Sequence, residues 1–154
     1  MKLINTPRIN DALKEVATLK QKGEKIIVLS RDDEFNRKIL EKAKIDIFLI
    51  NEEIETKDYS KQRNSGLNEV LAELAAKNKI KIGLDIDKII KKDKKEQAKS
   101  LARLAQNILL CKKAGAELTI FSEKGIKEKK ALQALLLTLG SSTDSANKAV
   151  QESF

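Results

Sequence analysis

The feature that most constrains the fold is a regular alternation between short β-branched, apolar runs and longer segments with helical periodicity. Four runs are typical of buried strands, and they cover residues 25–30, 45–50, 80–86 and 117–122. The segments between them are long enough for the helical crossovers that join parallel strands. The sequence therefore predicts an α/β protein with a parallel sheet.

Helices are expected where apolar residues recur every three or four positions. Their expected ranges are about 9–20, 32–40, 66–77, 94–114, 127–139 and 143–150. Asp32 and Asp33 place negative charge at the start of the second helix, where the helix dipole favours it. Gly115 is expected to end the longest helix, because glycine readily adopts the left-handed conformation of a helix C-terminus.

The topology expected from this pattern is an arc of a barrel. Right-handed crossovers between neighbours give the strand order 1-2-3-4, and about four βα units are too few to close a barrel. Because the pattern starts on a helix, the outer edge of the strand at residues 25–30 is unpaired. We expect a terminal segment or another chain to cover that edge, which makes self-association possible. The length of 154 residues suits one domain over residues 1–154.

The residue inventory excludes several classes of site. The chain has no His and one Cys, Cys111, so it has no internal disulfide, no all-Cys zinc site and none of the commonest catalytic bases. Its first residues carry no apolar signal region and no run is long enough to span a membrane. We therefore expect a cytoplasmic protein without a membrane partner.

Positive charge is concentrated in one part of the chain. Residues 88–130 contain 13 Lys and Arg against 5 Asp and Glu, so this window carries the whole net charge of +8. A neutral body with one basic third indicates either a polyanion partner or a lysine-rich solvated surface.

The segment Arg63-Asn64-Ser65-Gly66-Leu67-Asn68 is the first candidate site. Ser65 is expected to cap the helix that follows, with Asn68 reaching back toward the backbone. Free N–H groups at the helix start and the neighbouring Arg63 would form a small anion-binding corner. The alternative is an ordinary, well-capped helix.

The long helix is the second candidate. Its core stripe is expected to contain apolar residues at helical spacing, namely Leu101, Leu104, Ala105, Ile108, Leu109 and Cys111. An exposed ridge is expected from Lys95, Lys99, Arg103 and Gln106. Such a ridge can follow phosphates, and without nearby aromatic residues an RNA contact here would be to the backbone. The alternative is a solvated helix face.

No catalytic centre can be assembled from the remaining polar residues. Asp85 and Asp87 end a predicted strand and could hold magnesium, but the simpler interpretation is that Asp87 caps the next turn. Cys111 falls on the apolar face of its helix, and Ser122 has no base to activate it.

Two motifs resemble a known family. Residues 63–75, followed by 79–83, resemble the signature R-x-S-G-L-N-x-V-L-A-x-L-A … V-x-I of ribonuclease P protein component 3, the thirty-kilodalton subunit of archaea and eukaryotes. Residues 102–113 are similar to the family's A-R-x-R-x-N-x-R-L-C-R-K helix. The resemblance extends over nearly the whole chain from about Ile4, but the family's first strands have no counterpart. Leu104 and Leu109 also replace basic residues of the family's helix.

The resemblance implies a partial TIM-barrel-like subunit of a ribonucleoprotein that removes the 5′ leader from precursor tRNA. In that enzyme the RNA is the catalyst, acting with magnesium, and the protein needs no active site or cofactor of its own. The implied partners are ribonuclease P RNA, ribonuclease P protein component 2 and, indirectly, precursor tRNA. The alternative is a TIM-barrel-like metal-dependent phosphoesterase, although such enzymes hold their metals mostly with His.

The resemblance also places RNA-binding residues. It assigns Arg63, Asn64, Ser65 and Asn68 to the signature corner, Arg103, Lys112 and Lys113 to the basic helix, and Arg37 to a position where similar sequences hold a basic residue. Lys95 and Lys99 join this set because they lie on the predicted ridge.

Overall fold

The structure, a computed structural model, describes residues 1–54, 57–58, 60, 63–122 and 128–151. Its described part contains a parallel sheet with the sequential strand order β1-β2-β3-β4-β5. The strands are β1 (Lys2–Ile4), β2 (Ile26–Leu29), β3 (Ile47–Leu49), β4 (Lys81–Asp85) and β5 (Leu118–Phe121). The predicted parallel sheet and neighbour-to-neighbour order are confirmed, and they are consistent with a partial TIM-barrel-like fold.

The prediction of about four strands and a start on a helix is wrong at the N-terminus. Residues Lys2–Ile4 form β1, which pairs in parallel with β2 in the register Lys2 to Ile26 and Ile4 to Val28. A terminal segment of the chain therefore covers the outer edge of β2, which is the first of the two coverings expected from the sequence. The strand β1 has three residues, which are too few to show a strand periodicity, and only Ile4 among them is buried.

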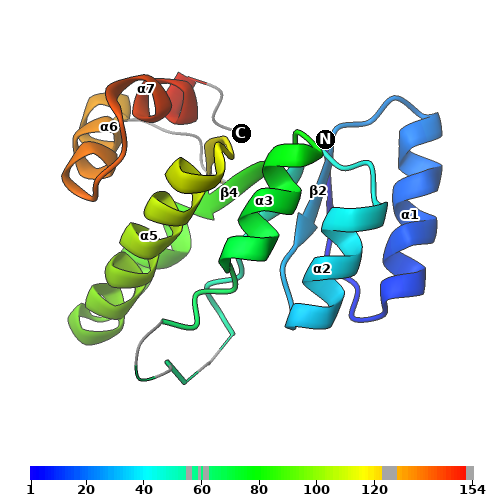
Figure 1. Cartoon of the computed structure of the whole chain (residues 1–154), viewed down its shortest axis with the longest axis horizontal. Helices are drawn as coiled ribbons and strands as arrows, with labels where there is room; N and C mark the ends of the chain where they lie inside the picture. Colours follow the sequence, from blue (N-terminus) through cyan, green and yellow to red (C-terminus); the bar gives the residue numbers. More distant parts are fainter. Residues whose placement is uncertain (55–56, 59, 61–62, 123–127, 152–154) are drawn as a thin grey trace.

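Helices cover one face of the sheet. They are α1 (Ile9–Gln21), α2 (Asp33–Lys42), α3 (Glu69–Lys77), α4 (Ile86–Lys91), α5 (Lys94–Ala114), α6 (Lys129–Thr138) and α7 (Thr143–Gln151). Figure 1 shows α1, α2, α3 and α5 side by side on that face, with α6 and α7 beyond α5. No helix in the described ranges is long and apolar enough to cross a membrane.

The core lies between the helices and the sheet. Phe48, Ile39, Leu71 and Ile108 are fully or almost fully buried there. A smaller buried cluster is formed by five residues of β2, β3 and β5, namely Ile27, Leu29, Ile47, Leu49 and Phe121. Because both faces of these strands are buried, their sequences are continuously apolar.

The long helix matches its predicted range, and Gly115 ends it in the left-handed conformation at φ +74°. Other boundaries differ. The run at 80–86 becomes a strand only to Asp85, whose carboxylate accepts a hydrogen bond from the Lys88 N–H and so starts α4. The predicted start of the helix at 127–139, residue 127, lies outside the described residues, and α6 is described from Lys129.

Gly83 has a steric role in β4. A Cβ atom at this position would lie 2.8 Å from Cγ2 of Ile47 and 3.0 Å from Cδ1 of Leu49. We expect Gly83→Ala to lower the free energy of unfolding by about 1–3 kcal/mol, because both neighbours belong to the smaller buried cluster and have little room to move. Urea denaturation measures the change, and unaltered or increased stability would contradict it.

Candidate nucleic-acid interface

The predicted corner at residues 63–68 is held against α5 by hydrogen bonds between side chains of α5 and the corner. The Arg63 N–H donates to Oε1 of Gln106 at 3.0 Å, and Nε2 of Gln106 donates to the Arg63 carbonyl at 2.8 Å. This two-way amide bond fixes the main chain at Arg63 to the middle of α5. Gln106, expected on an exposed ridge, is therefore a structural anchor.

Ser65 has a different role from the predicted one. Its buried hydroxyl donates to Oδ1 of Asn107 at 2.6 Å, so it fastens the corner to α5 and does not cap a helix. Asn68 is the N-cap of α3, and its Oδ1 accepts from the Leu71 N–H at 2.9 Å. The helix therefore begins at Glu69 and not at Gly66, because Gly66 has the left-handed φ of +75°.

Asp58 and Arg103 form a second anchor. Nε and Nη2 of Arg103 donate to Oδ1 of Asp58 at 3.1 and 3.0 Å, and the same oxygen accepts from the Asn64 N–H at 2.8 Å. Arg63 adds a longer ion pair at 3.6 Å. Partial burial raises the pKa of the Asp58 carboxyl, but the Asn64 N–H and the charges of Arg103 and Arg63 outweigh it and hold that pKa below its ordinary value.

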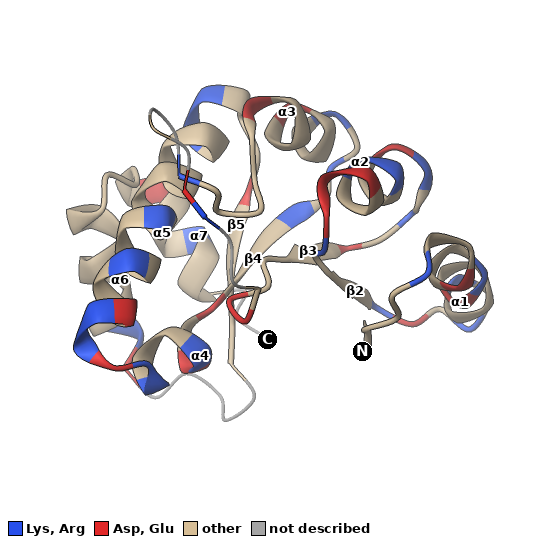
Figure 2. Ribbon diagram, turned by 90° about the horizontal axis from the view of Figure 1, so that it is seen from below, with Lys and Arg blue, Asp and Glu red and all other residues tan. Residues whose placement is uncertain are grey.

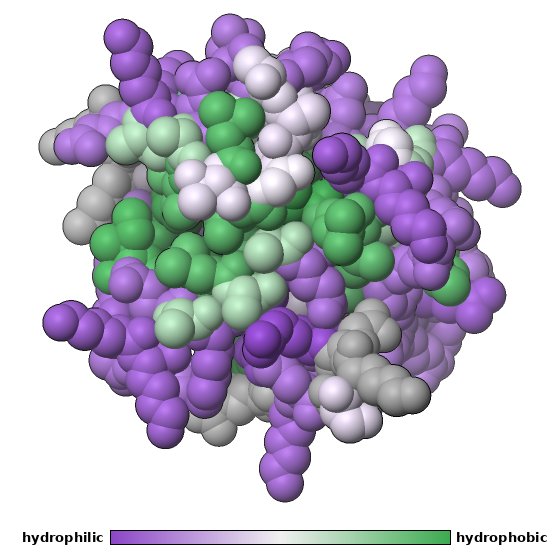
Figure 3. Space-filling model, turned by 60° about the vertical axis from the view of Figure 1, so that its left-hand side comes forward, coloured by the Kyte–Doolittle hydropathy of each residue, from purple (hydrophilic) through white to green (hydrophobic). Residues whose placement is uncertain are grey.

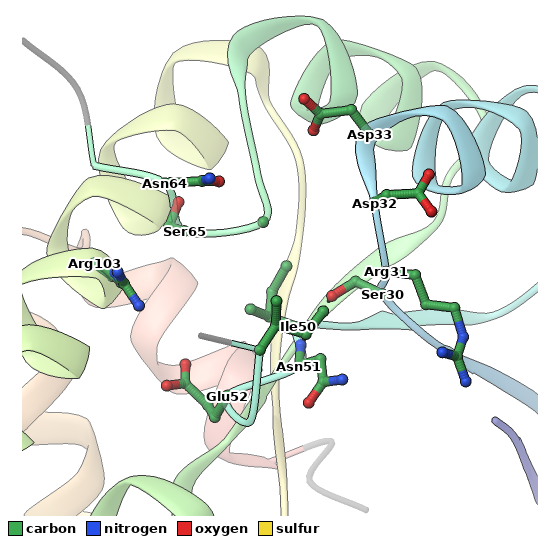
Figure 4. A pocket seen from close by; sticks show the side chains of 12 residues that line it. Ser30, Arg31, Asp32, Asp33, Ile50, Asn51, Glu52, Asn64, Ser65 and Arg103 are labelled. Carbon is green, nitrogen blue, oxygen red and sulfur yellow. Dashed lines mark hydrogen bonds between the residues drawn. The ribbon is translucent and has the colours of Figure 1, made fainter. Parts of the chain in front are cut away.

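A cavity of about 290 Å³ opens beside this corner. Its walls come from the loops after β2 and β3, from the corner and from α5, so it lies at the carboxyl ends of the strands, where parallel α/β proteins place their binding sites. In Figure 4 the side chains of Arg103 and Asn64 reach toward the cavity, and the side chain of Arg31 turns away from it. Nη2 of Arg31 donates instead to Oδ1 of Asn5 at 2.7 Å.

The cavity has mixed charge. Asp32, Asp33 and Glu52 line it together with Arg31 and Arg103. Asp32 caps α2 by accepting from the Phe35 N–H at 2.9 Å, as its position in the sequence predicts. Because acidic side chains stand beside the arginines, the cavity itself is a poorer phosphate site than the lysines outside it.

Two of the exposed lysines of α5, Lys95 and Lys99, lie in its first half. Lys95 has no ion pair among the described residues, and Lys99 pairs with Glu96 at 2.7 Å on the same exposed surface. Figure 2 shows Lys and Arg distributed along α5 and around the end of α4. Of the predicted ridge, only Lys95 and Lys99 are exposed as expected, since the Arg103 side chain is 18% exposed and bonded to Asp58.

The remaining predicted residues occupy two further places. Lys112 and Lys113 lie at the exposed end of α5, and Nζ of Lys113 pairs with Glu69 at the start of α3 at 2.6 Å, which raises the pKa of Lys113. Arg37 lies on α2, and its pair with Glu41 at 2.8 Å raises its pKa. The structure thus brings Arg63, Asn64, Ser65 and Arg103 together, with Asn68 at the start of α3, but Arg37 stands apart.

The polar residues considered for catalysis have structural partners. Asp85 caps α4, and Asp87, the expected cap, instead accepts from the Ser122 hydroxyl at 2.9 Å. Cys111 is buried on the core face of α5 as predicted, and burial raises the pKa of its thiol to about 12. Among the described residues, no three His, Cys, Asp or Glu side chains lie where they could hold one metal ion.

Sequence reasoning missed three polar anchors. Oδ1 of Asn107 accepts a hydrogen bond from the Ser65 hydroxyl. The side chain of buried Asn36 accepts from the N–H of Arg31 and donates to its carbonyl. Nζ of Lys92 donates to Glu52 and to the Ser100 hydroxyl. Asn36, Ser100 and Asn107 each lie on the buried face of a helix. A polar residue on an apolar face is the signal that could have revealed them.

Known proteins resemble this chain over most of its length. Ribonuclease P protein component 3 of Methanococcus vannielii is 29% identical over 134 residues, which cover 84% of this chain and 55% of that protein. The same component from Methanococcus maripaludis is 28% identical over 140 residues, or 88% of this chain and 57% of that protein. The chain is similar to ribonuclease P protein component 3. The resemblance inferred from the two motifs is confirmed, although no family model matches.

A solved structure supports the same relationship. A chain of the cryo-EM structure of archaeal ribonuclease P with mature tRNA has a TM-score of 0.77 at 25% identity, over 97% of this chain and 63% of that one. This chain therefore spans a little over half the length of the component 3 relatives and less than two thirds of the solved chain. The phosphoesterase alternative gains no support from these comparisons.

Proposed function

We propose that this chain is a non-catalytic protein subunit of ribonuclease P that supports RNA-catalysed removal of the 5′ leader from precursor tRNA. The observation that carries the proposal is the match of nearly the whole chain to a chain of archaeal ribonuclease P. The component 3 relatives point to the same assembly. In this proposal the catalyst is the RNA with its magnesium, and the protein binds no cofactor itself.

The RNA contact in this proposal is electrostatic. Lys95 and Lys99 offer exposed charge on the first half of α5, and the corner at residues 63–68 fixes the neighbouring loop to the same helix. Lysines on one ridge bind the phosphate backbone without reading bases. The partners proposed are ribonuclease P RNA directly, precursor tRNA through that RNA, and protein component 2, in the cytoplasm.

Salt dependence tests the electrostatic contact. With about five phosphate contacts, the logarithm of the affinity for ribonuclease P RNA should fall against the logarithm of salt concentration with a slope of about −3.5 to −4.5. Filter binding or fluorescence anisotropy at several salt concentrations gives this slope. A slope near zero would contradict phosphate neutralisation.

Reconstitution tests the proposed role. Cleavage of precursor tRNA by the RNA with its other protein subunits should be faster, or require less magnesium, when this chain is added. The purified chain alone should leave precursor tRNA and a simple phosphodiester uncut in the presence of manganese. Phosphodiester hydrolysis by the chain alone would revive the phosphoesterase alternative.

A further inference from the structure

Apolar residues remain exposed on the side of α5 that turns away from the corner. Leu109, expected in the core, is 65% exposed, and Leu137 of α6 is 39% exposed. Figures 1 and 2 both show α6 beside α5. Figure 3 shows that hydrophobic side chains form a continuous band on this side of the molecule, bordered by hydrophilic ones.

The sequence of α5 accounts for its part of the band. One stripe at the spacing i, i+4, i+7, i+11, i+15 and i+18 contains Lys94, Ala98, Leu101, Ala105, Leu109 and Lys112. Its four apolar members all keep part of their surface exposed, and a lysine stands at each end. At the C-terminal end of the stripe, Lys112 lines a hollow together with Asp144, Ser145 and Lys148 of α7.

The second helix presents a shorter stripe of the same kind. Lys130, Ala134 and Leu137 follow at i, i+4 and i+7 on α6, and all three are exposed. Its other leucines face the core, since Leu136 is buried and Leu132 and Leu135 pack against the core cluster. We call the apolar surface of these two helices the α5–α6 face and define it by Ala105, Leu109, Ala134 and Leu137.

The charges bordering this face indicate its partner. Lys94, Lys112 and Lys130 are exposed, and the described residues offer none of them an ion pair. Lys94 and Lys130 also lie in the first turns of their helices, where the helix dipole disfavours positive charge. Glu117 and Asp144 line the same hollow as Lys112, but Lys94 and Lys130 leave the start of each helix positively charged. A second copy packed through the same face would bring lysines of both copies to one rim, whereas Asp or Glu at the rim of another protein would pair with them.

We propose that the α5–α6 face binds an amphipathic helix of another protein, with leucine-like side chains on one stripe and Asp or Glu on both sides of it. Apolar anchors in the centre and complementary charges at the rim are the ordinary anatomy of such an interface. The face lies on a different ridge of α5 from Lys95 and Lys99, and of the predicted RNA-binding residues only Lys112 borders it.

Synthetic helices test this proposal directly. The probe is a fluorescent peptide of about 20 residues, the length of α5, with leucines at i, i+4, i+7 and i+11 flanked by glutamates. A scrambled peptide of the same composition and a peptide with lysine in place of glutamate are the controls. We expect the acidic amphipathic peptide alone to bind, and amide chemical shifts to change at residues 98–112 and 130–138.

Surface variants separate this face from the rest of the molecule. Leu109→Glu combined with Leu137→Glu should weaken peptide binding at least about ten-fold, because both positions would place charge against the apolar stripe. Val70→Glu is the matched control, since Val70 is 52% exposed on α3 and lies outside the face. Far-UV circular dichroism verifies that each variant folds, and both changed leucines are exposed in the native chain.

Three results would overturn the proposal. Equal binding of the scrambled peptide, or binding that the double variant leaves unchanged, would show that the face is not the site. Self-association that Leu109→Glu abolishes in sedimentation experiments would identify a second copy as the occupant. If the native chain binds the acidic peptide but does not bind ribonuclease P RNA, only the proposed function is contradicted.

Discussion

Replacing Arg103 with alanine is expected to lower the free energy of unfolding by about 1–2 kcal/mol and to release the loop before α3 from α5. The change removes both guanidinium bonds to Asp58, a partly buried carboxylate that also holds the Asn64 N–H. This expectation differs from the one suggested by the sequence, in which Arg103 belongs to a free ridge. Urea denaturation measures the stability, and faster amide exchange at residues 63–66 reports the release.

The pH dependence of the free energy of unfolding tests whether Asp58 is the residue through which Arg103 stabilises the protein. The pKa of Asp58 is lower in the folded protein than in the unfolded chain. The ionised carboxylate therefore contributes to the free energy of unfolding above the ordinary Asp pKa of about 4, and this contribution is lost as the pH falls through the pKa of the folded protein. The difference in stability between the native chain and Arg103→Ala should therefore shrink below about pH 4. Lys99→Ala is the control, because Lys99 is exposed and pairs only within its own helix. Equal effects of the two changes would contradict a structural role for Arg103.

Local patterns predicted the regular elements well. The helix α5 was found by its apolar spacing and by Gly115, because both signals act within the segment itself. The strands β2 to β5 were found because burial on both faces makes their sequences continuously apolar. The three-residue strand β1 was missed, since it forms only through its pairing with β2.

The anchors of the corner could not be predicted for a related reason. Asp58 and Arg103 are 45 residues apart in the sequence, and Ser65 and Asn107 are 42 residues apart. The local sequence around each residue therefore does not predict which residue it bonds. The same contacts explain the error in the α5 core stripe. Asn107 is buried with its Oδ1 accepting from the Ser65 hydroxyl, and this orientation of the helix leaves Leu109 in solvent.

The largest expected effect on RNA binding is that of Lys95→Gln combined with Lys99→Gln. Both side chains are exposed on the first half of α5, so neutralising them should remove phosphate contacts without disturbing the core. If each lysine neutralises one phosphate, the salt slope should fall in magnitude by about 1.4–1.8, and affinity for ribonuclease P RNA should fall about ten-fold or more. Fluorescence anisotropy across a salt series measures both quantities.

The matched control for this pair is Lys14→Gln combined with Lys20→Gln. Both of these lysines are exposed on α1, which Figure 1 places at the opposite end of the helical layer from α5. The control removes the same total charge, so a general electrostatic attraction would weaken equally in both variants. A localised ridge predicts a much larger loss from the α5 pair, because only contacts within about a Debye length of a bound phosphate survive screening at physiological salt. Equal losses of RNA affinity in the two variants would show that binding depends on the overall charge of the chain and not on a contact at Lys95 and Lys99.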